Sequence, residues 1–214
     1  PAQIGWGIGK NPEQVFNRRW FMKPGSNAAD PFGQLKDKVK MNPPRGSPNL
    51  DAPAGPIDPD VSILAVQSVD GRPIAVLANY SLHYVGGIPG GAVSADYFGE
   101  FARRLAAMLD ADGLDPPFVG IMSNGTSGDI NNINFQKPRE SQDPFVQVHG
   151  VADSVARTAY DTYQQIEFHR DLSLAASERE IELGVRKPSE AELQPARELL
   201  KNAEGLALIG LDEI

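Results

Sequence analysis

The sequence contains no cysteine and only three histidines among its 214 residues. The absence of cysteine excludes disulfide bonds, a thiolate zinc site and a cysteine nucleophile. The histidines are His83, His149 and His169, and none of them is paired at the HxH, HxxxH or HExxH spacing that marks a metal site. No complete metal site can therefore be recognised from spacing alone.

Long apolar runs and positive charge are also scarce. No run approaches the roughly 18 apolar residues of a membrane-spanning helix, so we predict no transmembrane segment. The 20 Lys and Arg against 28 Asp and Glu give a net charge of −8, which argues against nucleic acid as a partner. The chain begins with Pro1 rather than Met, and we expect a mature or excised piece whose targeting segment is not seen.

The charge is unevenly distributed. Residues 1–50 carry eight Lys and Arg against three Asp and Glu, whereas the remainder carries twelve against twenty-five. This pattern indicates either a solvated loop region packed on an acidic body or a basic rim at the mouth of a pocket.

The N-terminal part of the chain is rich in proline and glycine. Residues 1–60 contain ten of the 18 prolines, and residues 23–60 show no periodicity, so we predict a Pro-rich surface excursion there. The Gly5, Gly7 and Gly9 pattern has no preceding strand and is only a weak signal for a phosphate loop. It fits better a backbone that turns or passes close to another element.

Apolar runs alternate with amphipathic stretches in the rest of the chain. Residues 61–69 and 73–80 predict two strands joined at the Asp70-Gly71 turn, with both faces covered because nearly all their residues are apolar. Residues 117–122 and 172–183 predict two more strands. Helices are predicted at 95–110, capped by Ser94, at 144–166, and after a Ser189–Glu192 capping box, with a kink or restart at Pro195.

This order predicts an α/β fold with a mixed, largely buried β-sheet and flanking helices. The apolar residues 206–214 have no partner in the sequence, so we expect residues 1–214 to be a single partial domain of a larger catalytic domain. Ligands of such sheets bind outside the carboxyl ends of the strands. His83 and the polar residues 123–134 both follow predicted strands and are therefore the candidate site.

The polar loop at residues 127–134 has three interpretations. Asp129, Asn131 and Asn134 offer hard oxygen ligands of the kind that calcium prefers, although the EF-hand spacing is not met. Alternatively, the glycines and small polar residues offer N–H donors for an oxyanion, with Asp129 orienting a ligand. The third interpretation is an Asx-rich turn that satisfies its own backbone.

Several phrases of the sequence resemble one family. Asn79 and His83 lie in Asn-x-x-x-His after an apolar strand, and the next strand leads into Ser-Asn-x-x-x-Gly-Asp at 123–129. With Asn17-Arg18 and the Ile-Asp-Pro-Asp phrase at 57–60, these resemble the catalytic domain of neutral/alkaline non-lysosomal ceramidases from about residue 4 to residue 163. The phrases at 79–87 and 94–105 are similar to those of bacterial ceramidase-like proteins of unassigned substrate.

The resemblance implies a zinc-dependent amidohydrolase that cleaves an amide or ester bond of an N-acyl, lipid-like substrate. His83 would be the one metal ligand present here, because the family's other ligands fall outside the matching region. Arg18 would contact the substrate or its developing oxyanion, Gly128 and Asn124 would help to bind the substrate, and Asp129 would shape the pocket. Asn131 stands where the family has its serine, and an asparagine cannot act as a nucleophile.

The resemblance also implies a setting for the protein. It implies an extracytoplasmic location, either periplasmic or secreted, and the rest of a longer chain as the partner that completes the zinc site. The alternative function is a non-catalytic extracytoplasmic ligand-binding protein that keeps the ceramidase-like fold.

Overall fold

The computed structural model describes residues 1–27 and 35–202. These residues form two units, which we describe separately. The first unit comprises residues 1–27 and 38–173, and the second contains residues 35–37 and 174–202.

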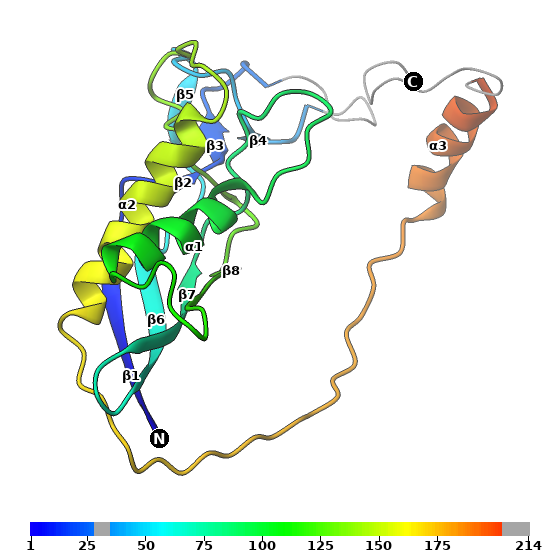
Figure 1. The fold of residues 1–214 in the computed structure, drawn as a ribbon. Helices are drawn as coiled ribbons and strands as arrows, with labels where there is room; N and C mark the ends of the chain where they lie inside the picture. Colours follow the sequence, from blue (N-terminus) through cyan, green and yellow to red (C-terminus); the bar gives the residue numbers. More distant parts are fainter. Residues whose placement is uncertain (28–34, 203–214) are drawn as a thin grey trace. The chain divides into compact units, whose positions relative to one another are not determined.

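A four-stranded sheet forms the centre of the first unit. It is built from β1 (Ala2–Lys10), β6 (Asp60–Ser68), β7 (Pro73–Tyr80) and β8 (Val119–Asn124), in the order β1-β6-β7-β8. The pairs β1/β6 and β6/β7 are antiparallel, and β7/β8 is parallel. The parallel pair requires a crossover connection, which contains α1 (Asp96–Met108). The predicted mixed α/β fold is therefore confirmed (Figure 1).

Two helices cover one face of this sheet. Helix α1 packs on β8 and on α2 (Val146–Tyr163), and α2 packs on β1 and β6 (Figure 1). The core beneath them contains Tyr80, Tyr97, Phe101, Leu105, Val151 and Val155, all with at most 1% of their surface exposed. Burial raises the pKa of the Tyr80 hydroxyl well above its usual range, and this hydroxyl donates to the Asn11 carbonyl at 2.6 Å.

The opposite face of the sheet is not covered by other residues of the first unit. Its exposed apolar side chains are Trp6, Ile8, Leu64, Leu77, Val119 and Ile121, each between 39% and 63% exposed. Within residues 1–27 and 38–173, the prediction that both faces of the β6 and β7 strands are covered is thus wrong. A nearly continuous apolar run predicted two covered faces, but within these residues only the helix-facing side has a partner.

Strand β1 shows why the chain opens with alternating glycines. The N–H and carbonyl groups of β1 pair with β6, and its glycines face α2. A Cβ atom on Gly7 would lie 2.6 Å from Ile166 Cγ2 and 2.9 Å from Thr162 Cγ2. The prediction of a backbone that passes close to another element is confirmed, although the strand itself was not predicted.

Short strands bring distant parts of the chain together. Strand β2 (Phe16–Asn17) pairs with β9 (Ile130–Asn131), and β3 (Arg19–Met22) lies between β4 (Val39–Met41) and β5 (Leu50–Pro53). The Pro-rich residues 23–60 therefore contain two strands, where the sequence showed no periodicity. Each has only three or four residues, too few to give a recognisable alternation.

The second unit contains α3 (Glu190–Asn202). The predicted capping box is half formed: the N–H and Oγ of Ser189 both donate to Glu192 Oε2, but the Glu192 N–H donates to the Ser189 carbonyl and not to its Oγ. Pro195 lies inside the helix and does not restart it. The predicted strand at 172–183 is wrong: its alternating residues are exposed and pair with no strand among the described residues. The apolar residues 206–214 lie outside the described residues.

Among the helices of the described residues, none combines the length and hydropathy that crossing a membrane requires.

Candidate functional site

The candidate site lies where the parallel strands β7 and β8 end. Tyr80 pairs with Asn124 at the ends of these strands, and the Gly125 N–H donates to the Tyr80 carbonyl at 2.9 Å. A Cβ atom on Gly125 would lie 2.6 Å from Ser81 Oγ, so a glycine here lets the segments after β7 and β8 approach without displacing the Ser81 side chain. Parallel strands leave their carboxyl ends at one edge, and this places the loop after β7 beside the loop after β8.

Arg18 joins these two loops. The β2–β9 pairing aligns Arg18 with the polar loop, and its backbone N–H donates to the Asp129 carbonyl at 2.7 Å. The Arg18 Nη2 atom donates to the Gly128 carbonyl at 2.6 Å, and Nη1 lies 3.5 Å from His83 Nε2. Arg18, His83, Gly128 and Asp129, which the sequence selected separately, are therefore brought together.

The hydrogen bonds of His83 determine which ring nitrogen carries the proton. His83 Nδ1 lies 2.6 Å from the Tyr84 carbonyl, and a carbonyl only accepts. The guanidinium near Nε2 only donates. Both contacts are satisfied when Nδ1 is protonated and Nε2 presents its lone pair. A nitrogen in this state can accept a proton or bind a metal.

Asn17 holds the carboxylate of Asp129 in place. Its Nδ2 donates to Asp129 Oδ2 at 3.0 Å and to the Pro56 carbonyl at 3.2 Å, and its Oδ1 accepts from the Arg19 N–H at 2.9 Å. Only 3% of Asn17 is exposed. The sequence showed Asn17 as part of a family phrase but gave no sign of this contact, which joins residues 112 positions apart.

Asp96 fixes the loop that follows His83. Its carboxylate accepts from the N–H groups of Val85 at 2.9 Å, Gly86 at 3.0 Å and Tyr97 at 2.7 Å. Asp96 is 8% exposed and has a positive φ of 52°. Sequence reasoning placed it only at the start of a helix. The bonds to Val85 and Gly86 show that it also positions the loop.

Two predicted site residues lie apart from the hydrogen-bond cluster of Asn17, Arg18, His83, Gly128 and Asp129. Asn131 is in β9, opposite Phe16, and Asn124 is exposed at the end of β8. Among residues 1–27 and 35–202, neither side chain forms a hydrogen bond with Arg18, His83 or Asp129. The other histidines are elsewhere: His149 contacts Glu100 between α1 and α2, and His169 pairs through its backbone with Ile4.

The donor set available for a metal is small. In the described part of the chain, no three His, Asp or Glu side chains come close enough together to hold a metal ion. His83 suits a zinc ion as a single ligand through Nε2, but a tetrahedral site needs further ligands. The described residues therefore do not make a zinc site by themselves.

An apolar hollow lies on the other side of Asn17. It has a volume of about 330 Å³, and its walls include Val15, Phe16, Trp20 and Ile57, with Asn17 and Asn134 at its polar edge. Val15 is fully buried and Trp20 is 5% exposed. The size and apolar walls suit an alkyl group of a ligand.

Comparisons with known proteins support the fold. No protein-family model matches the chain, and no curated protein matches it. The structure is similar to that of neutral ceramidase from Pseudomonas aeruginosa, with a TM-score of 0.51 and 17% identity, covering 77% of this chain. It is also similar to a ceramidase complexed with C2, with a TM-score of 0.50 and 15% identity, again over 77% of this chain. The chain spans only 22–23% of the length of these ceramidases. The comparisons thus show a ceramidase-like fold.

Proposed function

We propose that this chain is part of a hydrolase of the ceramidase type, which cleaves an amide or ester bond in an N-acyl, lipid-like substrate. The observation that carries the proposal is the position of Arg18. Its guanidinium contacts both His83 Nε2 and the Gly128 carbonyl, so it links the loops at the carboxyl ends of β7 and β8. Ligands of α/β sheets bind at this edge, and the structural similarity to neutral ceramidase supports the type of reaction.

Each residue of the cluster has a part in this proposal. Arg18 donates to the substrate carbonyl oxygen and stabilises the negative charge that develops on it. The Asn17–Asp129 bond holds the polar loop in position, and the hollow beside Asn17 takes the acyl chain. Asn131 replaces the family's serine and contributes only hydrogen bonds.

His83 would hold a zinc ion through Nε2, together with ligands from outside the described residues. When bound, zinc supplies a Lewis acid that polarises the carbonyl and lowers the pKa of water to about 7. Because the proposed reaction needs zinc, we expect a chelator to inhibit it. Asn131 cannot provide a nucleophile.

The test is hydrolysis of a panel of N-acyl amides and esters by the full-length protein, with and without a chelator. We expect cleavage that stops on chelation and returns with zinc. His83→Gln should abolish it, whereas His169→Gln, whose backbone pairing with Ile4 does not need the imidazole, should retain it. Cleavage that persists in chelator, or no cleavage of any substrate, would reject the proposal.

A further inference from the structure

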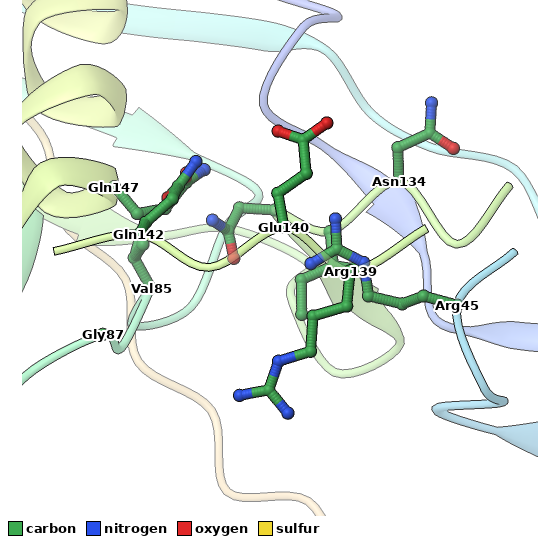
Figure 2. Close-up of a pocket in the computed structure, with 10 residues that line it drawn as sticks. Arg45, Val85, Gly87, Asn134, Arg139, Glu140, Gln142 and Gln147 are labelled. Atoms are coloured by element: carbon green, nitrogen blue, oxygen red, sulfur yellow. The ribbon is translucent and has the colours of Figure 1, made fainter. Parts of the chain in front are cut away.

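A second hollow lies next to the candidate site and has a different character. It has a volume of about 380 Å³ and is lined by polar side chains, among them Arg45, Arg139, Asn132 and Gln147 (Figure 2). Val85 and Gly87 line it from the loop after His83, and residues 132–134 line it from the loop that contains Asp129 and Asn131. Asn134 also lines the apolar hollow beside Asn17, so the two hollows are neighbours.

Two arginines in this hollow have no partner in the part of the chain that the structure describes. Among residues 1–27 and 35–202, neither Arg45 nor Arg139 forms a side-chain hydrogen bond or an ion pair, and Arg45 Nε is shielded from solvent without an acceptor. Figure 2 shows Arg45 extending from its own loop toward the segment with Arg139, while the Glu140 carboxylate points away from both guanidinium groups. In a chain with a net charge of −8, this is a local concentration of unpaired positive charge.

The position of Arg45 is built into the fold. The Gly46 N–H donates to the Phe135 carbonyl at 2.8 Å, and Gly46 has a φ of 67°, which glycine adopts readily. A Cβ atom on Gly46 would lie 3.2 Å from the Pro138 backbone. The loop carrying Arg45 is therefore held against the segment that carries Arg139.

The start of helix α2 lines the same hollow through Gln147, and the Val146 N–H before it donates to the Asp143 carbonyl at 3.3 Å. Gln147 is in the first turn, where backbone N–H groups have no acceptor within the helix. No side chain caps this end, and no acidic residue lies in the first turn. The Phe145 N–H donates to the Gly87 carbonyl at 2.9 Å, which ties the helix start to the loop after His83. The partial positive charge of a helix N-terminus favours an anion.

Asn132 is an independent sign that a ligand enters here. It lines the hollow, is only 7% exposed, and its Oδ1 has no hydrogen-bond donor among the described residues. A buried carbonyl oxygen without a donor is costly, and a ligand that carries an N–H or O–H group would satisfy it.

We infer that this hollow binds an anionic group, a carboxylate or a phosphate, at the polar end of the acylated substrate. Arg45 and Arg139 hold the charge, the first turn of α2 donates to its oxygens, and Asn132 accepts from an N–H or O–H beside it. The acyl chain then extends past Asn134 into the apolar hollow. The identification of this group as part of a substrate rests on the proposed function, whereas anion binding itself does not.

Calorimetric titration of the chain tests the inference. The probes are N-hexanoylglycine, its neutral counterpart N-hexanoylglycinamide, and inorganic phosphate. We expect N-hexanoylglycine or phosphate to bind, and the neutral amide to bind about tenfold more weakly or not at all. Binding of the glycine conjugate alone identifies a carboxylate site, and binding of phosphate alone identifies a phosphate site.

Charge variants show where the anion binds. Arg45→Gln and Arg139→Gln should each lower the affinity for the bound anion by about tenfold or more. Arg45→Lys should recover part of this loss. Arg179→Gln removes an exposed charge outside the hollow and should leave affinity within about twofold. Circular dichroism confirms that each variant is folded.

Three results would overturn the inference: no anion binding up to about 10 mM, equal affinity for the neutral amide, or equal loss in Arg45→Gln and Arg179→Gln. Because titration needs neither zinc nor turnover, it can fail while chelator-sensitive hydrolysis succeeds, and the reverse is also possible. The two proposals are therefore tested separately.

Discussion

Arg18 Nη1 lies 3.5 Å from His83 Nε2, although the two residues are 65 positions apart in the sequence. The neighbouring Nη2 atom donates to the Gly128 carbonyl at 2.6 Å. One guanidinium thus spans the loop after β7 and the loop after β8. The planar fork of arginine makes both contacts at once, and the single ammonium of lysine cannot reproduce that geometry.

Arg18→Lys should therefore damage activity more than stability. In the full-length protein, we expect hydrolysis of the best N-acyl or ester substrate to fall by about 100-fold, the loss typical of a missing oxyanion donor. The free energy of unfolding should fall by about 1 kcal/mol, the net value of a hydrogen bond. Arg19→Lys is the matched control, because this neighbour is exposed and, among residues 1–27 and 35–202, reaches the cluster only through its backbone N–H, which donates to Asn17. Equal activity in the two variants would contradict the role given to Arg18.

Asn17→Ala should destabilise the fold and release Asp129. The variant loses the bonds to Asp129, Pro56 and Arg19 in a nearly buried position, so we expect a loss of about 2–4 kcal/mol from denaturant unfolding. Asn49→Ala alters an exposed asparagine of the same unit outside the cluster and should cost clearly less. A loss of equal size in both variants would show that Asn17 is not specially placed.

Asp96→Asn should loosen the loop after His83. Asparagine tolerates the positive φ at this position, but its amide group would face an N–H donor of Val85 or Gly86. We expect amide hydrogen exchange at Val85 and Gly86 to accelerate at least about tenfold through local opening. Asp110→Asn is matched in backbone conformation, since Asp110 also has a φ of 52°, and should leave these amides unchanged. Unaltered exchange in Asp96→Asn would remove this positioning role.

The regular part of the fold could be predicted from the sequence, and the exceptions have physical causes. Strands β6, β7 and β8 and the helices α1 and α2 follow from apolar runs and stripes, because their packing on one another is what the pattern encodes. The run at 172–183 alternates in the same way but pairs with no strand among the described residues. Local alternation does not record whether a partner strand exists.

The candidate site, too, could be predicted from the sequence only in part. His83 and Asp129 could be selected because polar residues after buried strands mark a strand-end site. The contact between Asn17 and Asp129 and the two roles of Asp96 depend on tertiary pairing, which no local pattern contains. A basic rim at the mouth of a pocket was one interpretation of the charge in residues 1–50, which include Arg45. The sequence did not indicate that Arg139 lines the same hollow, since both arginines come from loops without periodicity.

Glu100 should make the free energy of unfolding depend on pH in the acidic range. This side chain is 6% exposed between α1 and α2, where it contacts His149, Arg103 and Arg104. Burial acts to raise the pKa of the Glu100 carboxyl, but the hydrogen bond with His149 and the charges of the two arginines outweigh it, so the pKa is lowered. The folded state therefore favours the ionised form. Its contribution is present above the unfolded pKa of about 4.3 and is lost as the pH falls through the lower folded value.

The corresponding measurement is urea unfolding of Glu100→Gln and the unaltered chain as a function of pH. We expect the variant to be about 1–3 kcal/mol less stable at neutral pH, with the difference shrinking below about pH 4. Glu198→Gln removes an exposed carboxylate and should show no comparable trend. A difference between Glu100→Gln and the unaltered chain that is constant across this range would show that ionisation of Glu100 does not stabilise the fold.

The glycines of β1 should resist substitution because α2 lies against them. In Gly7→Ala, the added Cβ would meet Ile166 Cγ2 at 2.6 Å, and we expect a loss of about 1–3 kcal/mol from overpacking. Gly150→Ala in α2 has nothing within 4 Å of the added atom and should be neutral or stabilising by about 0.5–1 kcal/mol, because alanine favours a helix.

A double-mutant cycle of Gly9 with Thr162 tests whether the glycine is needed because α2 lies so close. The Cβ of Gly9→Ala would meet both Thr162 Oγ1 and Thr158 Cγ2. Thr162→Ala removes the first of these two obstacles, so the double variant should be more stable than the sum of the two single losses predicts. Additive losses would mean that the Thr162 side chain does not limit the size of residue 9.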